Sequence, residues 1–459
     1  MNKIQLRPTD ILFFRDGRPM GGASAGHGEA WPLPTMTDAA LHAALHRSGL
    51  QGHAHDQKQG RERGKNSSRS YGSLTQAGPF PVSPEEIWLF PRPLDLQDQQ
   101  TKPSLLPLNT ESLAANSLAK PLSYPVANRL APSKNRKTPK WISTEAMNSY
   151  LRGSNLEIEE KKHGYDDSDF SDTEHVVGIG IDPDTHTTGS GAAKGQIYSA
   201  NYLRLQEGWR LGLIAETNEK IQNDRRRRDD LIPQLLDNPK GILVGGQQRR
   251  CTAHLDANTA NPLPSFQLKA SQLKELVNRR YGVKWTLLSP AIFPATKKHA
   301  QRGGTNHSGG WLPNWIDPES GDVMLKAEDT KRHEGERRDE WRKRIRAMPN
   351  AHARLVSAIT GKALPITGWA LAHEAANRSE GGAKPTLLAV PAGSVYYFEA
   401  ESAEAAVELA NALSWHGELK EGQAPHSILN RRSTSLGEKG FGLGVCSAWS
   451  DFPKSSATS

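Results

Sequence analysis

The stretch IQLRPTDILFFRDGRPMGGASAGHGEAWPLPTMTDAALHAALHRSGL, from Ile4 to Leu50, decides how the chain begins to fold. Its first part, as far as Phe14, predicts a buried strand, which a polar FRDGRP turn and a glycine-rich loop follow. Thr35 with Asp38 three residues later predicts a weak capping box at the start of a helix. That helix carries one apolar stripe: Ala40, Leu41, Ala44 and Leu45.

A strand, a basic glycine-rich loop and a short alanine-rich helix, in this order, form the opening of a ferredoxin-like unit. Arg15 and Arg18 lie in the loop, where two guanidinium groups and free backbone N–H groups favour contact with phosphates. The alternative interpretation of the same loop is an ordinary surface hairpin.

Length and charge limit what the protein can be. Its 459 residues predict two domains with insertions. A net charge of +8 and a pI near 9.3 favour a polyanionic partner over an acidic small substrate. Nucleic acid is the commonest such partner.

Cysteine usage and hydropathy indicate a reducing compartment. Only Cys251 and Cys446 occur, so the sequence predicts neither a disulfide framework nor a cysteine zinc site. The N-terminus has no signal-peptide core, and no run approaches the ~20 apolar residues that a membrane span requires. We therefore expect a cytoplasmic protein without a membrane partner.

Two polar stretches interrupt the first half of the chain. Residues 51–78 are rich in Gln, Gly, Ser and Arg and predict an insertion that burial cannot order. The alternative is an arm that orders on RNA. Residues 97–140, rich in Pro, Ser, Asn and Lys, predict a second long insertion.

Structured segments are expected around these insertions. Ile87–Phe90 predicts a short strand, and Trp141–Arg152 predicts an amphipathic helix. His175–Glu216 predicts three strands, the last two joined in a hairpin at Glu207-Gly208. Gly241–Leu255, GILVGGQQRRCTAHL, predicts one buried strand with a glycine bulge.

In the second half the pattern predicts three helices. Ser271–Gly282 is helix-like, and Lys331–Arg346 predicts an exposed helix with charges of both signs. Ser402 is the expected N-cap of a third helix, which Gly417 ends.

No set of residues predicts catalysis or cofactor binding. Gly22–Gly26 has the letters of G-x-S-x-G but lacks the helix that a nucleophile elbow needs directly after its serine. The glycine-rich segments at Gly178 and Gly440 depart from a dinucleotide fingerprint, and no histidine pair has metal-ligand spacing. We therefore expect no catalytic residue, no metal and no cofactor.

Several blocks in a fixed order resemble one known family. In the first half they are the opening stretch, GPFPVSPEEIWLFPRPLDL from Gly78, HVVGIGID from His175 and VGGQQR from Val244. In the second half they are GGWLPNWIDPESG from Gly309, ITGWALAHE from Ile366 and VPAGSVYYFEA from Val390. Together they resemble the RAMP proteins, which are RNA-binding subunits of CRISPR interference complexes, and more narrowly the third-subunit family of the type III-B (Cmr) effector.

This resemblance implies an α+β fold of two ferredoxin-like (RRM-like) RAMP domains with long loop insertions. The first domain would span residues 1–260, with insertions at about 51–78 and 97–175. The second would span residues 261–459, with an insertion at about 296–362.

The resemblance also implies a non-catalytic role in antiviral defence. Such a subunit binds the 5′ repeat-derived tag of the guide crRNA and docks the large polymerase-like subunit. A backbone RAMP subunit beside it cleaves the target RNA, so the third subunit meets target RNA only indirectly.

The family pattern implies Arg249 and Arg250 as phosphate contacts, in addition to Arg15 and Arg18. It also implies that a glycine-rich loop near the C-terminus packs against guide RNA. In this sequence the loop is GFGLG, and its expected contact residues are Gly440, Phe441 and Gly442. The alternative is a tight turn that requires positive φ.

Other functions remain open. A RAMP endoribonuclease that processes repeat RNA would need a histidine general base near the glycine loop, and His416 and His426 are nearest in sequence. A purely structural docking subunit would leave every RNA contact to its partners. A metabolic enzyme with a phosphate substrate is disfavoured by the failed motifs, and a sister family from another type III subtype would share these blocks.

Overall fold

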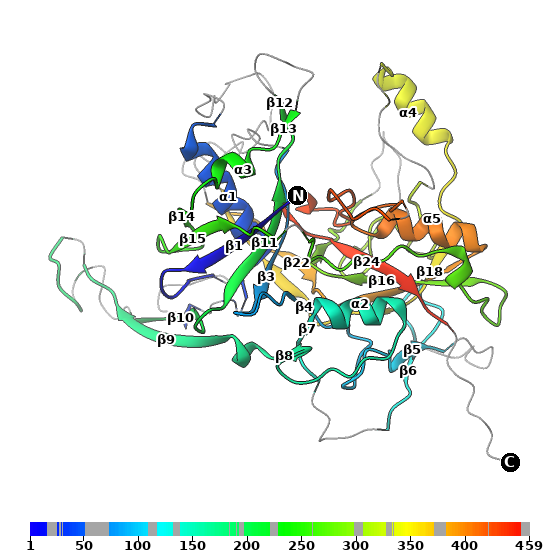
Figure 1. The fold of residues 1–459 in the computed structure, drawn as a ribbon, viewed down its shortest axis with the longest axis horizontal. Helices are drawn as coiled ribbons and strands as arrows, with labels where there is room; N and C mark the ends of the chain where they lie inside the picture. The colour runs from blue at the N-terminus through cyan, green and yellow to red at the C-terminus, as the bar shows by residue number, and fades with distance from the viewer. Residues whose placement is uncertain are drawn as a thin grey trace.

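Two antiparallel sheets, one from each half of the chain, organise the fold (Figure 1). The computed structural model describes residues 1–15, 25, 26, 29, 31–50, 73–108, 117–131, 138–182, 184–189, 191, 197–220, 228–258, 260–297, 306–326, 333, 335–370, 382–420 and 422–450. Arg18 and most of the predicted insertion at 51–78 lie outside these residues.

The first sheet has the strand order β14-β15-β1-β11-β3. Its strands are β1 (Asn2–Pro8), β3 (Thr75–Val82), β11 (Arg210–Glu216), β14 (Lys240–Leu243) and β15 (Arg250–Leu255). β1 lies in the middle of the sheet because it pairs with β15 on one side and β11 on the other. The alternation of its side chains places Ile4 and Leu6 in the core and Gln5 on the opposite face. A buried strand near the N-terminus is therefore confirmed, but its predicted extension to Phe14 is wrong, because the strand ends at Pro8 and residues 9–14 form a loop.

Helix α1 (Pro34–Ser48) covers the core face of this sheet, beside the short helix α3 (Ile232–Leu235). The apolar stripe predicted for α1 is buried there. The predicted capping box is wrong, because the helix begins at Pro34 and its N-cap, Leu33, makes no side-chain cap hydrogen bond. A proline at the first position has a φ already suited to a helix, so no cap is needed to begin it.

The second sheet has the order β18-β23-β16-β24. Its strands are β16 (Tyr281–Leu287), β18 (Ala353–Ile359), β23 (Val395–Ala400) and β24 (Gly444–Ala448). Helix α5 (Ala403–Leu413) covers one face, and the Ser402 hydroxyl accepts a hydrogen bond from the Ala405 amide at 3.1 Å, which confirms the predicted cap. The helix ends at Leu413 instead of Gly417.

The four strands of the second sheet and four of the five in the first follow one order across the sheet. The fourth strand in chain order lies beside the first, then come the third and the second, and every neighbouring pair is antiparallel. In the second half, α4 (Arg338–Ala347) comes in the chain between β16 and β18, the first and second strands of the second sheet in sequence. It has no buried residue and projects away from the sheet, as predicted for an exposed helix (Figure 1).

Residues 83–170 form a layer that packs against both sheets. This layer contains one sheet, one strand pair and two helices: β4 (Leu89–Pro91), β7 (Trp141–Ser143) and β8 (Gly164–Tyr165); β5 (Leu105–Pro107) and β6 (Val126–Asn128); α2 (Thr144–Arg152) and η4 (Asp167–Asp169). Its apolar side chains share one core with Ile214 of β11 and Val445 of β24. The range 97–175, expected as a loop insertion, thus holds ordered elements in its described part.

A buried polar network fixes this layer to the second sheet. The Asp95 carboxylate accepts hydrogen bonds from the hydroxyl groups of Tyr150 (2.9 Å) and Tyr397 (3.1 Å) and pairs with Lys284 at 3.3 Å. Asp95 is fully buried and Lys284 is 3% exposed. The Lys284 ammonium also lies 3.7 Å from the centre of the Tyr150 ring.

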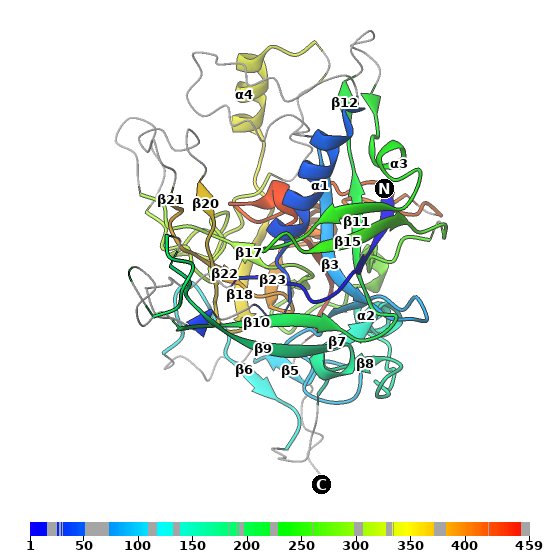
Figure 2. The same ribbon diagram turned by 90° about the vertical axis from the view of Figure 1, so that its left-hand side faces the viewer.

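A long hairpin, β9 (Ser171–Ile179) with β10 (Ile197–Leu205), extends from the first sheet (Figures 1 and 2). The hairpin predicted at Glu207-Gly208 is wrong. β10 pairs antiparallel with β9, which precedes it in the chain, over nine residues. After the turn at Glu207-Gly208 the chain continues as β11, which pairs with β1 in the five-stranded sheet. The strand pattern was correct, but it carries no information about which sheet each strand joins.

Two other local predictions are wrong. Gly241–Leu255 is a hairpin of β14 and β15 instead of one bulged strand, because residues 244–249 form its turn. Ser271–Gly282 forms no α-helix. The short η6 (Ala270–Gln272) is followed by a turn in which the Leu276 amide donates to the Arg280 carbonyl, and β16 begins at Tyr281. Leu276 is 3% exposed, so burial of this side chain overrides a weak helix propensity.

The remaining short elements are β2 (Ala25–Gly26), β12 (Glu219–Lys220), β13 (Arg228–Asp229), β17 (Ala291–Ile292), β19 (Leu364–Ile366), β20 (Trp369–Ala370), β21 (Gly382–Ala383), β22 (Leu387–Val390) and η7 (Gly437–Lys439). Across the described residues, no helix is both long and apolar enough to span a bilayer.

We expect Lys284→Met to lower the free energy of unfolding by about 3–5 kcal/mol, since it leaves the Asp95 carboxylate buried without its cation. Urea denaturation at pH 7 measures this loss. Adding Asp95→Asn should recover part of it, because the double variant has no buried charge at this point. Lys120→Met removes a solvent-exposed ion pair with Glu319 and should leave stability unchanged; equal losses in the two single variants would contradict the prediction.

Candidate nucleic-acid interface

Loop 9–15, which follows β1, lies against three other segments at one end of the first sheet. The Thr9 amide donates to the Arg250 carbonyl at 3.0 Å, and Leu12 exchanges two hydrogen bonds of 2.8 Å with Leu203 of β10. The Phe13 carbonyl accepts from the Gly246 amide at 2.8 Å. Segments far apart in sequence therefore meet around this loop.

The turn between β14 and β15 requires glycine at position 245, where it contacts loop 9–15. Gly245 has φ +81°, and a Cβ atom there would lie 2.5 Å from the Phe13 carbonyl oxygen. Gln247 and Gln248 also have positive φ. These glycines thus allow a close approach, and its partner is the chain's own backbone.

An aromatic stack joins the loop, the hairpin and the turn. The rings of Phe13 and Tyr202 have centroids 5.3 Å apart, and the Arg249 guanidinium lies 5.2 Å from the centre of the Tyr202 ring. The Tyr202 hydroxyl donates to the side chain of Gln247 at 2.8 Å. These contacts hold Arg249 in place while 29% of its side chain remains exposed.

Acidic residues compensate only part of the positive charge at this end of the sheet. Asp10 lies 4.0 Å from Arg249 and 3.1 Å from Arg204, and Arg204 also pairs with Glu174 at 2.7 Å. Arg250 is exposed, and so is Arg15. Arg249 Nε is buried without a hydrogen-bond partner. We call the exposed or half-exposed arginines Arg15, Arg249 and Arg250, with the Tyr202 ring, the arginine cluster.

The structure places the predicted GFGLG loop away from the arginine cluster. Gly440 and Gly442 have φ +91° and +76°, so the loop makes the positive-φ turn that the alternative interpretation requires, and its contact with guide RNA stays a prediction. Phe441 is fully buried, in contact with Ile292 and Ile366. The ring is therefore covered by protein and unavailable for stacking on a base.

This loop and the arginine cluster lie at opposite ends of the first sheet. A Cβ on Gly440 would lie 3.1 Å from the carbonyl oxygen of Gln76, which pairs with Ala215, the neighbour of Asn2 at the start of β1. Arg250 instead follows the end of β1 in the register. The structure therefore brings Arg249 and Arg250 beside loop 9–15 but does not bring Gly440–Gly442 to them.

The two histidines considered as catalytic bases differ in exposure. His416 is 2% exposed, its Nδ1 lies 2.7 Å from the Gly417 carbonyl, and its Nε2 accepts from the Phe266 amide at 3.4 Å. Burial lowers the pKa of His416 to about 4. A ring buried in this way is not accessible to an RNA hydroxyl. His426, by contrast, is exposed and lines the same surface pocket as Met1 and Asp256.

Metal-ligand and thiol chemistry find no support in the described part of the chain. No group of three or more His, Cys, Asp or Glu side chains there is arranged to hold a metal ion. Cys251 and Cys446 are both buried and unpaired, and burial raises the pKa of the Cys251 thiol to about 12.

Tyr202 and Arg204 are residues of this surface that the sequence did not indicate. Tyr202 lies 47 positions before Arg249. The pairing of β10 with Leu12 and the hydrogen bond from the Gly246 amide to the Phe13 carbonyl bring the two together. The one local signal was an aromatic residue two positions from an arginine in a predicted strand.

Comparison with known proteins identifies one family. The model of the family described as CRISPR-associated protein (Cas_Cmr3) matches residues 4–444. No curated protein matches the sequence.

Solved structures match at low sequence identity. A chain in a cryo-EM structure of the type III-B Cmr-beta complex bound to cognate target RNA and AMPPnP is 14% identical, with 86% of each chain covered and a TM-score of 0.40. In the same complex bound to target RNA, the values are 13%, 86% of each chain and 0.39. A chain of the Csm3–Csm4 subcomplex of the type III-A interference complex is 11% identical, with 86% of this chain and 92% of that chain covered and a TM-score of 0.32.

The contact between α1 and the GFGLG loop predicts a pH dependence. Asp38 is buried, with Lys439 Nζ at 3.4 Å and His42 Nε2 at 3.7 Å, and burial outweighs Lys439 to raise its pKa from 3.8 to about 6. Between these values the folded protein binds a proton that the unfolded chain has released, so stability should fall as pH rises from 4 to 6, by about 1–3 kcal/mol.

Thermal unfolding from pH 4 to 7 measures this dependence, and Asp38→Asn should flatten it. Lys439→Met should steepen it, because the buried carboxylate then loses its cation. His42 is present in both variants, so its own titration does not distinguish them. An unchanged slope in Asp38→Asn would show that another group is responsible.

Proposed function

The chain belongs to the Cas_Cmr3 family of CRISPR-associated proteins, the third-subunit family of the type III-B (Cmr) effector, and we propose that it binds the 5′ repeat-derived tag of the guide crRNA. The observation that carries this proposal is the arginine cluster, in which the Arg249 guanidinium lies over the Tyr202 ring. Arg15 and Arg250 are exposed on adjoining segments at the same end of the first sheet. Family members are generally non-catalytic subunits, and we propose the same role here.

The strand order of the two sheets supports two ferredoxin-like RAMP domains. An antiparallel sheet in which the fourth strand lies beside the first, followed by the third and second, is the arrangement of that unit. The strands of the first sheet lie within residues 2–255 and those of the second within 281–448. These limits agree with domains at 1–260 and 261–459.

RNA contacts through loops, instead of through a sheet face, follow from the layer at residues 83–170. In RRM-type modules, bases stack on the open face of the sheet. Here the face of the second sheet opposite α5 carries Lys284 and Tyr397, which contact Asp95 of the layer. That face of the second sheet is occupied by protein, which favours the exposed basic loops over this sheet face as positions for a nucleic acid.

The arginine cluster suits a splayed single strand. Arg15, Arg249 and Arg250 offer charge to phosphates, and Arg249 loses little side-chain freedom on binding because the Tyr202 ring already positions it. Arg18 belongs to the same proposal through its place in the loop sequence.

Docking of the large polymerase-like subunit is the second part of the proposal. The β9–β10 hairpin exposes Val177 (60%), Ile179 (57%) and Ile197 (60%), and the register puts Ile179 directly opposite Ile197. Val177 and Ile179 are two residues apart and so lie on one face. An exposed apolar face on an edge strand is typical of an interaction surface.

Replacing Arg15, Arg249 and Arg250 together by alanine should weaken binding of a single-stranded guide that carries the tag. The slope of log affinity against log salt should decrease by about 0.7 for each phosphate that an arginine no longer neutralises. Filter binding across a salt series measures both quantities. The matched control removes three exposed arginines of α4, Arg338, Arg342 and Arg346, and should change neither; unchanged slope and affinity in the first variant would refute the RNA contact.

Crosslinking of the assembled complex separates RNA binding from a purely structural role. The proposal expects crosslinks between loop 9–15 or residues 244–250 and the first guide nucleotides. A subunit that only docks its partners would give none. Labelled repeat RNA that is cut by the purified chain would instead establish the endoribonuclease alternative.

Val177→Lys with Ile179→Lys should abolish co-purification of the chain with the large subunit, since two charges would be buried in the interface. Guide RNA affinity should stay unchanged, because the arginine cluster is untouched. Val277→Lys with Leu388→Lys is the matched control, since both side chains are exposed and lie outside the hairpin. Assembly of the hairpin variant at the wild-type level would rule out this surface.

A further inference from the structure

A second basic site lies away from the arginine cluster. A cavity of about 490 Å³ opens where the 83–170 layer meets the end of the second sheet. Its walls come from residues around β5, from Arg129 after β6, from the end of α2, from residues 266–274 and from the end of β24. In Figure 1, α2, β5 and β6 lie on the side of the molecule away from the tip of the β9–β10 hairpin.

The charged side chains that line this cavity are all cationic: Lys102, Arg129, Arg152, Lys274 and Lys284. Lys284 has a carboxylate partner, Asp95, which lies outside the lining. The described residues supply no carboxylate within ion-pair distance of the other four. A cleft lined by one sign of charge concentrates the electrostatic field and attracts anions.

Arg129 supplies the most specific sign of a missing ligand. Its Nε atom is buried and has no hydrogen-bond partner, although its backbone is fixed by a bond of 2.9 Å from the Arg129 amide to the Ser104 carbonyl. A buried guanidinium donor without an acceptor is costly. An anion in the cavity would offset part of this cost through its attraction to the guanidinium charge.

The rest of the lining suits an apolar ring. Tyr150, Phe266 and Trp449 contribute aromatic surface, and Phe266 is half-buried. Leu106, Leu151 and Leu268 complete the apolar part of the wall. A cavity of this volume that combines apolar walls with a few convergent cations is within the range of small-molecule sites.

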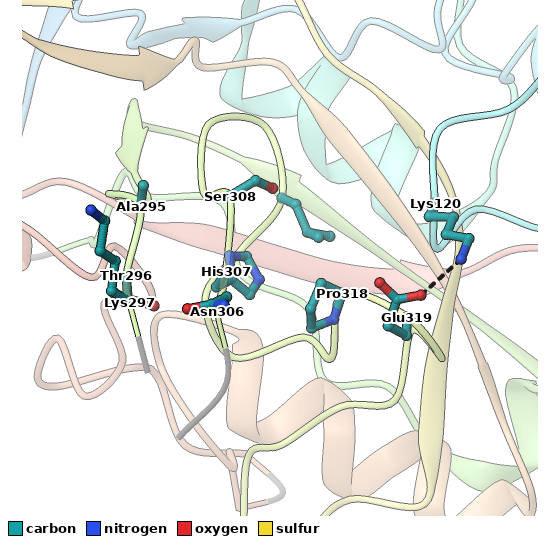
Figure 3. Close-up of a pocket in the computed structure, with 10 residues that line it drawn as sticks. Lys120, Ala295, Thr296, Lys297, Asn306, His307, Ser308, Pro318 and Glu319 are labelled. Carbon is teal, nitrogen blue, oxygen red and sulfur yellow. Dashed lines mark hydrogen bonds and ion pairs between the residues drawn. The ribbon is translucent and has the colours of Figure 1, made fainter. Parts of the chain in front are cut away.

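The larger cavity, of about 690 Å³, lacks this combination (Figure 3). An ion pair of 2.8 Å between Lys120 and Glu319 lies at one side of it, so its charges are mixed. Both ring nitrogens of its buried His307 contact backbone groups, at 3.1 Å to the Ile316 carbonyl and 2.9 Å to the Gly309 amide. It therefore offers no buried donor that lacks an acceptor.

We propose that the 490 Å³ cavity binds a nucleoside phosphate, with the phosphate near Arg129 and the base against the aromatic wall. The ligand is either a free nucleotide or the terminal nucleotide of an RNA strand, because the two share the same chemistry. The site is separate from the arginine cluster, and the proposal does not depend on guide-tag binding.

Calorimetric titration of the full chain tests the proposal with four probes. AMP should bind saturably. Adenosine, which lacks the phosphate, should bind with an affinity at least about tenfold lower. If RNA is the source, a 5′-phosphorylated oligonucleotide should bind and its 5′-hydroxyl counterpart should bind weakly. Performing the RNA titrations in the Arg15→Ala, Arg249→Ala, Arg250→Ala variant removes binding at the arginine cluster.

Arg129→Gln should reduce affinity for the bound probe about tenfold or more. Since this half-buried residue also supports folding, Lys274→Gln, an exposed residue at the rim, should reduce affinity while leaving the thermal transition unchanged. Lys297→Gln in the larger cavity is the control and should have no effect. The absence of saturable binding by AMP and by the phosphorylated oligonucleotide, or equal losses in Lys274→Gln and Lys297→Gln, would overturn the proposal.

Discussion

The contact of Asp95 with Lys284 is the interaction on which the arrangement of the molecule depends. It joins a residue of the first half of the chain to the central region of the second sheet, 189 positions away. Both groups are almost fully buried, and burial lowers the pKa of the Lys284 ammonium while Asp95 opposes that shift. A buried charge without its partner would cost several kcal/mol of folding free energy, so the layer and the sheet must pack in the one relative position that pairs Asp95 with Lys284.

This constraint explains why the two sheets differ from free RNA-binding sheets. The helix α5 covers one face of the second sheet and the layer covers the other, so its strands serve as a scaffold. The loops and turns at the ends of the strands remain accessible, and they carry the charge. Function on loops that a rigid core positions is a general solution in proteins.

Local patterns in the sequence predicted the presence of β1, α1 and α5, because an apolar run, an apolar stripe and a serine cap act within a few residues. The same patterns were insufficient for β10 and for Ser271–Gly282, where the outcome depends on distant partners. The stack of Tyr202 on Arg249 could not be predicted for the same reason. Arg249 and Arg250 were identified by family resemblance, whereas the burial of Phe441 became evident only in three dimensions.

The β9–β10 hairpin has a consequence for how the cell must supply this protein. In the sheet β2-β10-β9, strand β9 is at the edge, and Val176, Val177 and Ile179 stand exposed along it. Newly made chains that accumulate without an assembly partner would associate through these edges. Synthesis of this chain together with its assembly partner would keep that edge covered.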